Sequence, residues 1–241
     1  MQKKGRPFLA DPILDPIHFG FTESLMRYRE LRRRHPGAEI LMGTGNLTEL
    51  TDADTTGINA VLMGIVSELQ IRNVLVVRVS QHNRRAVAET DLARRIMFAA
   101  RADGALPQDY DGGLMGLRDR KPFPNAPQEI AEMAAAVRDA NFRIELAADG
   151  IHVFNRDGHH VAPDPFDLWP ALKLQDDAAH AFYMGVETAR AQIAWQLGKR
   201  YVQDRELDWG VAVERGVEDT GGYSPEKSTK AERKAGARAK Q

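Results

Sequence analysis

Short apolar runs alternate with longer amphipathic stretches over the first hundred residues. The short runs cover residues 8–14, 40–42 and 74–79, and the longer stretches cover residues 22–35, 55–69 and 84–101. Short apolar runs bounded by Gly, Pro or Asp predict strands, whereas apolar residues recurring every three or four positions predict amphipathic helices. The pattern therefore predicts three successive units, each consisting of a strand followed by a helix.

The third strand is the most informative of these elements. Val74-Leu75-Val76-Val77 is apolar at every position, which is typical of a strand in a parallel sheet that helices cover on both faces. Short connections between successive parallel strands imply right-handed crossovers. We therefore expect an α/β fold built from three βα units.

The pattern changes after residue 103. Residues 104–126 are rich in Gly and Pro and are expected to form a linker or long loop. Beyond it the sequence predicts an α+β module. Its expected elements are a helix at 127–141, strands at 142–146 and 151–154 around the hairpin signal Asp149-Gly150, and helices at 164–172 and 178–201. In the last helix, Phe182, Val186, Ala189, Ile193 and Leu197 share one face.

We therefore divide the chain into four segments: a βα domain at 1–103, a linker at 104–126, an accessory domain at 127–213 and a disordered basic tail at 214–241. Residues 224–241 contain no bulky apolar residue, so they cannot bury enough surface to offset their ordering entropy. Contact of this tail with RNA or an acidic partner is the alternative. No aromatic residues interleave with its basic ones, so a nucleic-acid partner is not expected.

The amino-acid composition excludes several kinds of functional site. The chain has no cysteine, which excludes thiolate metal sites, disulfides and cysteine nucleophiles, and its net charge of −1 gives no overall field for nucleic acid. No apolar run approaches the roughly 18 residues of a membrane span, and the N-terminus does not resemble a signal peptide. We expect a cytoplasmic protein with no membrane partner, whose chemistry relies on oxygen and nitrogen groups.

Polar residues follow each of the three predicted strands. Carboxyl ends of parallel strands line the ligand site in α/β folds, so these residues are the first candidates for binding. The candidate binding residues are Asp15, His18, Gly20, Gly43, Thr44, Asn46, Arg78 and Ser80. No catalytic residue is assigned.

Alternatives stand beside these candidates. Asp15 before proline is also a common turn former, and Gly43-Thr44-Gly45 suits a tight turn as well as a phosphate loop. Arg78 follows a strand expected to be buried, so its guanidinium needs an anionic partner, which is a ligand or an internal carboxylate.

Two further clusters contain residue types that can bind a metal ion. His159-His160 follows a predicted turn at Asp157-Gly158, and a surface loop is the simpler interpretation. The acidic residues Glu49, Asp52 and Asp54 precede a predicted helix, where capping is the simpler role and Mg²⁺ binding the alternative. No protein metal site is assigned.

The three strand ends together resemble the last three βα units of dihydropteroate synthase, a pterin-binding TIM-type barrel. The resemblance rests on Ile13-Leu14-Asp15-Pro16 followed by His18-Phe19-Gly20-Phe21, on Met42-Gly43-Thr44-Gly45-Asn46, and on Arg78-Val79-Ser80-Gln81. Residues 43–62 and 181–204 are also similar to dihydropteroate-synthase-related proteins associated with tetrahydromethanopterin biosynthesis.

This resemblance implies the C-terminal three βα units of a TIM-type barrel plus a small α+β accessory domain. It also implies a transferase reaction that joins an arylamine to a hydroxymethyl-dihydropterin diphosphate and releases diphosphate, with Mg²⁺ accompanying the diphosphate and no tightly bound organic cofactor. Asp15 would bind the pterin ring, Asn46 would line its pocket and Arg78 would meet the diphosphate or the ring.

Several residues depart from the family pattern. Asn46-Leu47 stands where the family has Arg-Lys, Ser80 and Gln81 replace a His and an Asp, and Ile17 replaces a glycine. A complete barrel needs eight strands, so the expected partners include a missing N-terminal barrel half, a second subunit or a second copy of the chain. The alternatives are a non-catalytic pterin-binding or assembly subunit of one-carbon metabolism, and a scaffold or RNA-associated protein.

Overall fold

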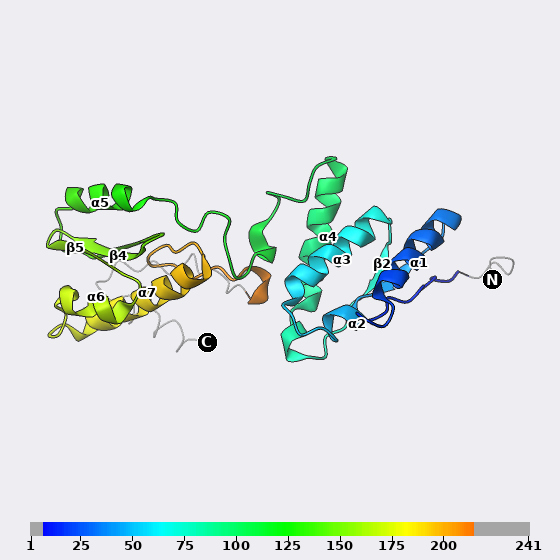
Figure 1. Cartoon of the computed structure of the whole chain (residues 1–241), viewed down its shortest axis with the longest axis horizontal. Helices are drawn as coiled ribbons and strands as arrows, with labels where there is room; N and C mark the ends of the chain where they lie inside the picture. The colour runs from blue at the N-terminus through cyan, green and yellow to red at the C-terminus, as the bar shows by residue number, and fades with distance from the viewer. Residues whose placement is uncertain (1–6, 215–241) are drawn as a thin grey trace, which may run out of the picture. The chain divides into compact units, whose positions relative to one another are not determined.

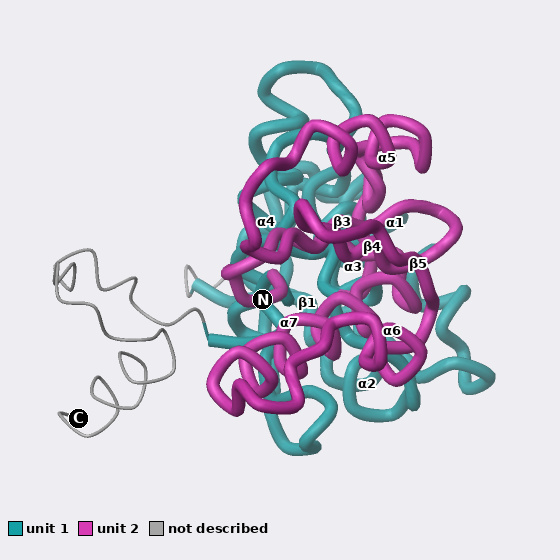
Figure 2. The backbone as a smooth tube through the Cα atoms, turned by 90° about the vertical axis from the view of Figure 1, so that its left-hand side faces the viewer, with its two compact units in different colours: residues 1–116, 209–215 teal, residues 117–208, 216–241 magenta. Residues whose placement is uncertain are grey.

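The structure is a computed structural model that describes residues 7–214. These residues form two compact units, of which unit 1 contains residues 7–116 and 209–214 and unit 2 contains residues 117–208. Figure 2 shows the units in teal and magenta. The boundary between Gly116 and Leu117 falls within the segment expected to be a linker. Apart from Glu214, the predicted basic tail lies outside the described residues.

Unit 1 is built around short parallel strands. Strands β1 (Leu41–Gly43) and β2 (Asn73–Leu75) pair in parallel, and a parallel bridge joins Ala10 to Ile40 on the other side of β1. Three extended segments therefore lie side by side in chain order, as the alternating pattern predicted. They are shorter than predicted, and the described residues do not close into a barrel.

The helices of unit 1 are labelled in Figure 1. They are α1 (Phe21–Arg34), α2 (Gly45–Thr48), α3 (Thr55–Glu68) and α4 (Ala86–Ala102), with short 3₁₀ helices at Gln81–Asn83, Gly112–Leu114 and Gly210–Ala212. Helices α1, α3 and α4 thus confirm the three predicted helices to within about two residues at each end.

The core of unit 1 lies between these helices and one face of the strands. Ile40 and Met42 are fully buried against Tyr28 of α1 and Leu62 of α3. Alternate residues of a strand point to opposite faces, so Leu75 lies on the other face, and it is 55% exposed. The prediction that 74–79 is buried on both faces is therefore wrong in this structure, because helices cover only one face.

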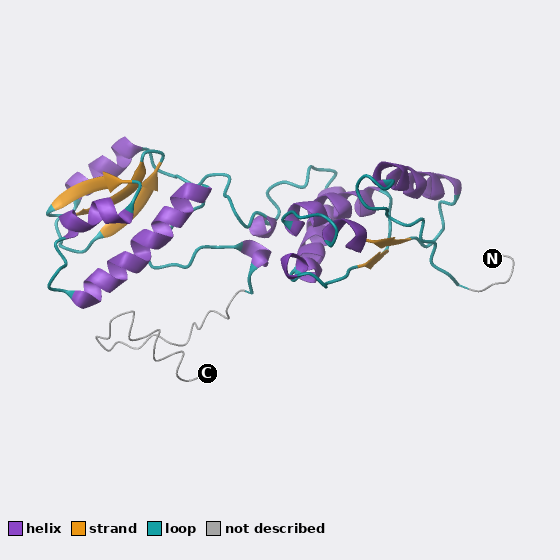
Figure 3. Cartoon of the chain, turned by 60° about the horizontal axis from the view of Figure 1, so that its bottom comes forward, coloured by secondary structure: helices purple, strands orange, loops and turns teal. Residues whose placement is uncertain are grey.

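Unit 2 is a three-stranded antiparallel sheet between helices. Strands β3 (Arg143–Ala147), β4 (Gly150–Asn155) and β5 (Gly158–Ala162) pair in chain order. Helix α5 (Pro127–Ala136) packs on one face, and α6 (Pro165–Leu172) and α7 (Ala178–Leu197) pack on the other, as Figures 1 and 3 show. The α+β character of this unit is confirmed.

Strand β5 was not predicted. His159 and His160 lie on this strand, opposite Phe154 and Val153 of β4, so their assignment to a surface loop is wrong. The reason is a two-residue turn at Arg156-Asp157, in which the backbone N–H of Asp157 donates to Oδ1 of Asn155 across 2.8 Å. That turn reverses the chain and forms a second hairpin. Helix α7 also ends earlier than predicted, at Leu197, because Gly198 adopts a φ of 70° and caps the helix.

Candidate functional site

The loops that follow the three extended segments of unit 1 are tied together by hydrogen bonds. The Nδ2 of Asn46 donates to the carbonyl oxygen of Leu14 across 2.7 Å. The backbone N–H of Thr44 donates to the carbonyl of Leu75 across 3.0 Å. A Cβ on Gly45 would lie 2.4 Å from Val77, so this position requires glycine. The three strand ends therefore meet at one edge of the sheet.

Asp15 is held in place by helix α1. Its Oδ2 accepts a hydrogen bond from Nη2 of Arg27 across 2.6 Å, and Arg27 also donates to the carbonyls of Pro12 and Ile13. A Cβ on Gly20, whose φ is 111°, would lie 3.0 Å from the same Oδ2. Gly20 therefore makes room for the carboxylate, while His18, at a φ of 67°, lies exposed in the turn between them.

Of the residues predicted to bind a ligand after the second strand, not all are accessible. Thr44 is fully buried, and its Oγ1 lies 3.4 Å from the carbonyl oxygen of Leu75, so its hydroxyl joins two strands rather than facing solvent. Gly43 lies on the uncovered face of the sheet, with nothing within 4 Å of its Cβ position. Asn46 is exposed beside Asp15. Of these three, Asn46 and Gly43 are open to a ligand in this structure.

Arg78 is exposed, and its guanidinium makes no ion pair or hydrogen bond within residues 7–214. The internal carboxylate, which was the alternative to a ligand as its partner, is therefore not found among the described residues, and the expected burial of Arg78 is wrong because the strand that carries it is not buried. Ser80 is partly buried, and its backbone N–H donates to Oε2 of Glu49 across 2.8 Å. Arg78 thus lies free at the same edge as Asp15 and Asn46.

Glu49 and Asn83 form a polar pair that the sequence analysis did not assign to the site. Oε1 of Glu49 accepts from the backbone N–H of Val79 across 2.7 Å and from Nδ2 of Asn83 across 2.5 Å. The Ser80 hydroxyl, the Val79 N–H and the Asn83 amide hold the pKa of this carboxyl at about 2. Glu49 therefore stays ionised and fixes the loop that carries Arg78 to the end of α2.

The capping role predicted for the acidic cluster is wrong. Asp54 is the N-cap residue of α3, but its side chain makes no capping hydrogen bond. Glu49 instead binds the loop after β2. Residues 7–214 contain no group of three or more His, Asp or Glu side chains placed to hold a metal ion. The oxygens of Glu49 already accept several hydrogen bonds, so they are poorly suited to Mg²⁺ as well.

A second buried carboxylate lies between α3 and α4. Glu89 is 4% exposed, and its Oε2 accepts hydrogen bonds from Thr55 and Asn59 across 2.7 and 2.9 Å. Thr90 completes the cluster by donating to Oδ1 of Asn59. These bonds join two helices that pack closely, so the cluster holds unit 1 together rather than facing a ligand.

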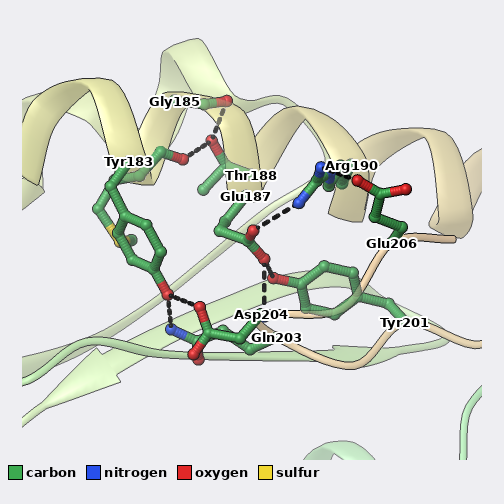
Figure 4. A network of polar contacts seen from close by, with 10 residues as sticks. Tyr183, Gly185, Glu187, Thr188, Arg190, Tyr201, Gln203, Asp204 and Glu206 are labelled. Atoms are coloured by element: carbon green, nitrogen blue, oxygen red, sulfur yellow. Dashed lines mark hydrogen bonds and ion pairs between the residues drawn. The ribbon is translucent and has the colours of Figure 1, made fainter. Parts of the chain in front are cut away.

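Unit 2 has a buried network around Glu187, which Figure 4 shows. Oε2 of Glu187 accepts from the Tyr201 hydroxyl across 2.8 Å and from the backbone N–H of Asp204 across 3.1 Å, while Oε1 accepts from Arg190 across 2.9 Å. Burial first, and then the Glu187 charge, raise the pKa of Tyr201. The network ties the segment after α7 back onto that helix.

Two histidines and an aspartate form a chain on the α5 side of the unit 2 sheet. The Nε2 of His152 lies 2.9 Å from Asp149, and its Nδ1 lies 2.9 Å from Nε2 of His159. Burial first, and then His152 and His160, lower the pKa of His159. His152 is only 1% exposed, whereas the Asp149 side chain is 48% exposed and His159 is partly buried, so the chain runs from the surface to a buried imidazole.

The described chain is thus a mixed α/β protein with small sheets, and its candidate site lies at the carboxyl ends of parallel strands. No helix within residues 7–214 is long and apolar enough to cross a membrane. The chain is 29% identical to an uncharacterized protein of Methanocaldococcus jannaschii over 225 residues. That match covers 83% of this chain and 42% of the relative, so the chain spans less than half of the relative's length. No protein-family model and no solved structure matches it.

Proposed function

We propose that unit 1 supplies three consecutive βα units of a dihydropteroate-synthase-like, pterin-binding TIM-type barrel. Three features support this: parallel extended segments in chain order, helices on one face only, and polar residues gathered at the carboxyl ends. In a βα barrel the helices cover the outer face and the strand ends form the ligand site. The uncovered face, on which Leu75 lies, would then point into the barrel.

The observation that carries the proposal is the hydrogen bond from Asn46 to Leu14, which sets Asn46 beside Asp15. An aminopyrimidinone ring presents adjacent N–H donors and acceptors. The free Oδ1 of Asp15 would accept from those donors, and the Asn46 amide would donate to and accept from the ring edge. The exposed guanidinium of Arg78 suits a diphosphate, which it would bind through planar, paired hydrogen bonds.

The proposed reaction joins an arylamine to a hydroxymethyl-dihydropterin diphosphate. The amine nitrogen attacks the exocyclic CH₂, the C–O bond to the diphosphate breaks, and the amine loses a proton. Arg78 would stabilise the charge that develops on the departing diphosphate, and Mg²⁺ brought with that diphosphate would share this role.

The proposed barrel also needs strands that the described residues do not contain. A parallel sheet is stable when both faces are covered and its edges are paired. More than half of the Methanocaldococcus relative lies outside the match, which is enough chain for further βα units. We propose that such units, on the same or another polypeptide, complete the pocket.

Pterin binding tests this proposal. The native protein, purified from its own cells with whatever associates with it, is titrated with 6-hydroxymethylpterin, and ring fluorescence is followed. We expect saturable binding that falls at least tenfold in Asp15→Asn and in Asn46→Ala. Asp91→Asn is the control, because within residues 7–214 the Asp91 carboxylate pairs with Arg94 and Arg95 on the surface of α4 and with no residue of the strand-end site. Absence of binding by the native complex would refute the proposal.

A non-catalytic pterin-binding subunit is the second candidate. It is favoured by the absence of the family's Arg-Lys at Asn46-Leu47 and of its His and Asp at Ser80-Gln81. Diphosphate release from the pterin diphosphate with 4-aminobenzoate separates the two candidates. Release that is lost in Arg78→Ala indicates the enzyme, and binding without release indicates the binding subunit.

A further inference from the structure

Helix α7 carries apolar residues on two faces, one packed against the unit 2 core and one exposed. The residues it buries are Met184, Glu187, Thr188, Ala191 and Ala194. At 100° per residue, the face opposite to these carries Phe182, Val186, Ala189 and Ile193, which we call the α7 seam. Phe182 is 66% exposed and Ile193 is 42% exposed. An amphipathic helix normally directs its apolar stripe into the core; α7 does so with Met184, Ala191 and Ala194 and leaves the seam as a second, exposed stripe.

We propose that the α7 seam is a docking surface for α7 of a second copy of this chain, in antiparallel orientation. This surface belongs to unit 2 and is independent of the pterin site proposed for unit 1.

The spacing of the seam suits a self-paired helix. Its residues follow one another at intervals of four, three and four, which is the spacing of core positions in a coiled coil. In an antiparallel pair, Phe182 of one copy packs against Ile193 of the other, and Val186 packs against Ala189. Each seam residue then packs against a seam residue of another type in the second copy. The two-fold axis of the dimer passes between Val186 and Ala189. All four residues of the seam are therefore covered by the second copy.

Charges at the two ends of α7 favour the antiparallel orientation. Asp176 and Asp177 precede the helix, and Arg200 follows it. The antiparallel pair brings Asp176 of one copy close to Arg200 of the other, whereas a parallel pair would set like charges side by side. The helix dipoles also oppose each other favourably in the antiparallel pair.

The position of Gly185 also favours close approach by a second copy of the helix. It lies in the interior of α7, is exposed, and has nothing within 4 Å of its Cβ position. Glycine in a helix interior is about 1 kcal/mol less favourable than alanine, and no packing within unit 2 requires it. In the proposed pair Gly185 lies opposite Gln192 of the second copy, where the absence of a side chain lets the backbones approach.

The C-terminal segment of the chain is a poor alternative occupant. Residues 215–241 contain Val217 and Tyr223 as their only bulky apolar residues. Neither repeats at coiled-coil spacing, so the segment has no stripe to match the seam. A second α7 is therefore the better complement in both shape and chemistry.

The proposed interface is small. A helix of 20 residues is about 30 Å long, and one helix pair lies at the low end of specific interfaces, below about 1,200 Å². We expect a dissociation constant on the order of 10 μM, corresponding to weak association.

Sedimentation velocity from low micromolar to millimolar protein tests the proposal. We expect a concentration-dependent dimer that is lost in Val186→Glu and in Ile193→Glu. Met133→Glu is the matched control, because Met133 is 39% exposed on α5, a different helix of the same unit. Circular dichroism checks that each variant is folded. A monomer at all concentrations, or a dimer that persists in folded Val186→Glu, would overturn the proposal.

Cysteine cross-linking tests the orientation. The chain has no cysteine, so introduced thiols are the only ones present. A mixture of Val186→Cys and Ala189→Cys chains is expected to form a mixed disulfide on mild oxidation. Efficient linking of Val186→Cys to itself would indicate parallel pairing and contradict the antiparallel arrangement.

Discussion

The amide of Asn83 donates to the carboxylate of Glu49 across 2.5 Å, and this bond joins the loops after two neighbouring strands. The same Nδ2 reaches the carbonyl of Val77 across 3.0 Å, while Asn83 itself is fully buried. One side chain thus fixes the loop that carries Arg78. The geometry proposed for the pterin site depends on this pair, although neither residue would touch the ring.

Replacing Asn83 by alanine should destabilise unit 1. The substitution removes a buried donor and leaves the Val77 carbonyl without one of its hydrogen bonds, which costs about 1–3 kcal/mol. Urea unfolding followed by circular dichroism measures the loss. Gln81→Ala is the control, because Gln81 is exposed two residues earlier in the same 3₁₀ helix. Equal unfolding midpoints for the two variants would contradict this prediction.

The contribution of Glu49 should depend on pH. Its folded pKa of about 2 lies below the ordinary glutamate value of 4.5, so the unfolded chain binds a proton first as the pH falls. The stabilisation is therefore complete above pH 4.5 and is lost between pH 4.5 and about 2. Wild type and Glu49→Gln should differ in urea midpoint at pH 7 and converge toward pH 2. A difference that does not change with pH would rule out the charged interaction as its source.

Gly20→Ala should weaken the Asp15 site. At a φ of 111° an alanine is strained, and its Cβ would lie 3.0 Å from Oδ2 of Asp15. We expect a loss of about 1–3 kcal/mol in the free energy of unfolding, together with weaker pterin binding. Gly57→Ala is the control. Gly57 lies in α3 with nothing within 4 Å of its Cβ position, so alanine there should be neutral or stabilising by about 0.4–1 kcal/mol.

Tyr201→Phe should destabilise unit 2. Tyr201 is 6% exposed and donates to the buried carboxylate of Glu187, so its loss leaves Oε2 with a single donor. The expected cost is about 1–3 kcal/mol in thermal or urea unfolding. Tyr110→Phe is the control, because the Tyr110 hydroxyl bonds to Asp103 at an exposed site. Similar losses in both variants would show that burial of the Glu187 network has no special importance.

The sequence predicted helices better than strands. Pro127 and Pro165 occupy the first turns of α5 and α6, where a proline fits without losing a hydrogen bond. A strand of three residues is too short for its apolar pattern to define where it begins and ends. The exposure of Leu75 depends on which elements cover the sheet, and not on its neighbours in the sequence. Strand β5 was missed because its adjacent histidines do not alternate with apolar residues.

The candidate site was predictable only in part. Polar residues at strand ends could be identified because parallel strands bring those ends to one edge, and Asn46 does lie beside Asp15. The partners of these residues could not be identified. Arg27 reaches Asp15 from a helix, and Asn83 reaches Glu49 across 34 positions of sequence, so each pairing requires the folded arrangement of the chain.

The sheet of unit 2 pairs only strands that follow one another directly, whereas β1 and β2 of unit 1 are joined through two helices. Closing a short turn costs less chain entropy than closing a long crossover, and folding rates rise as contacts become more local. Unit 2 should therefore complete its sheet sooner than unit 1. During synthesis and refolding, the slower pairing leaves the edge of β2 unprotected for longer, so crowding and dilution should affect the refolding yield of unit 1 more than that of unit 2.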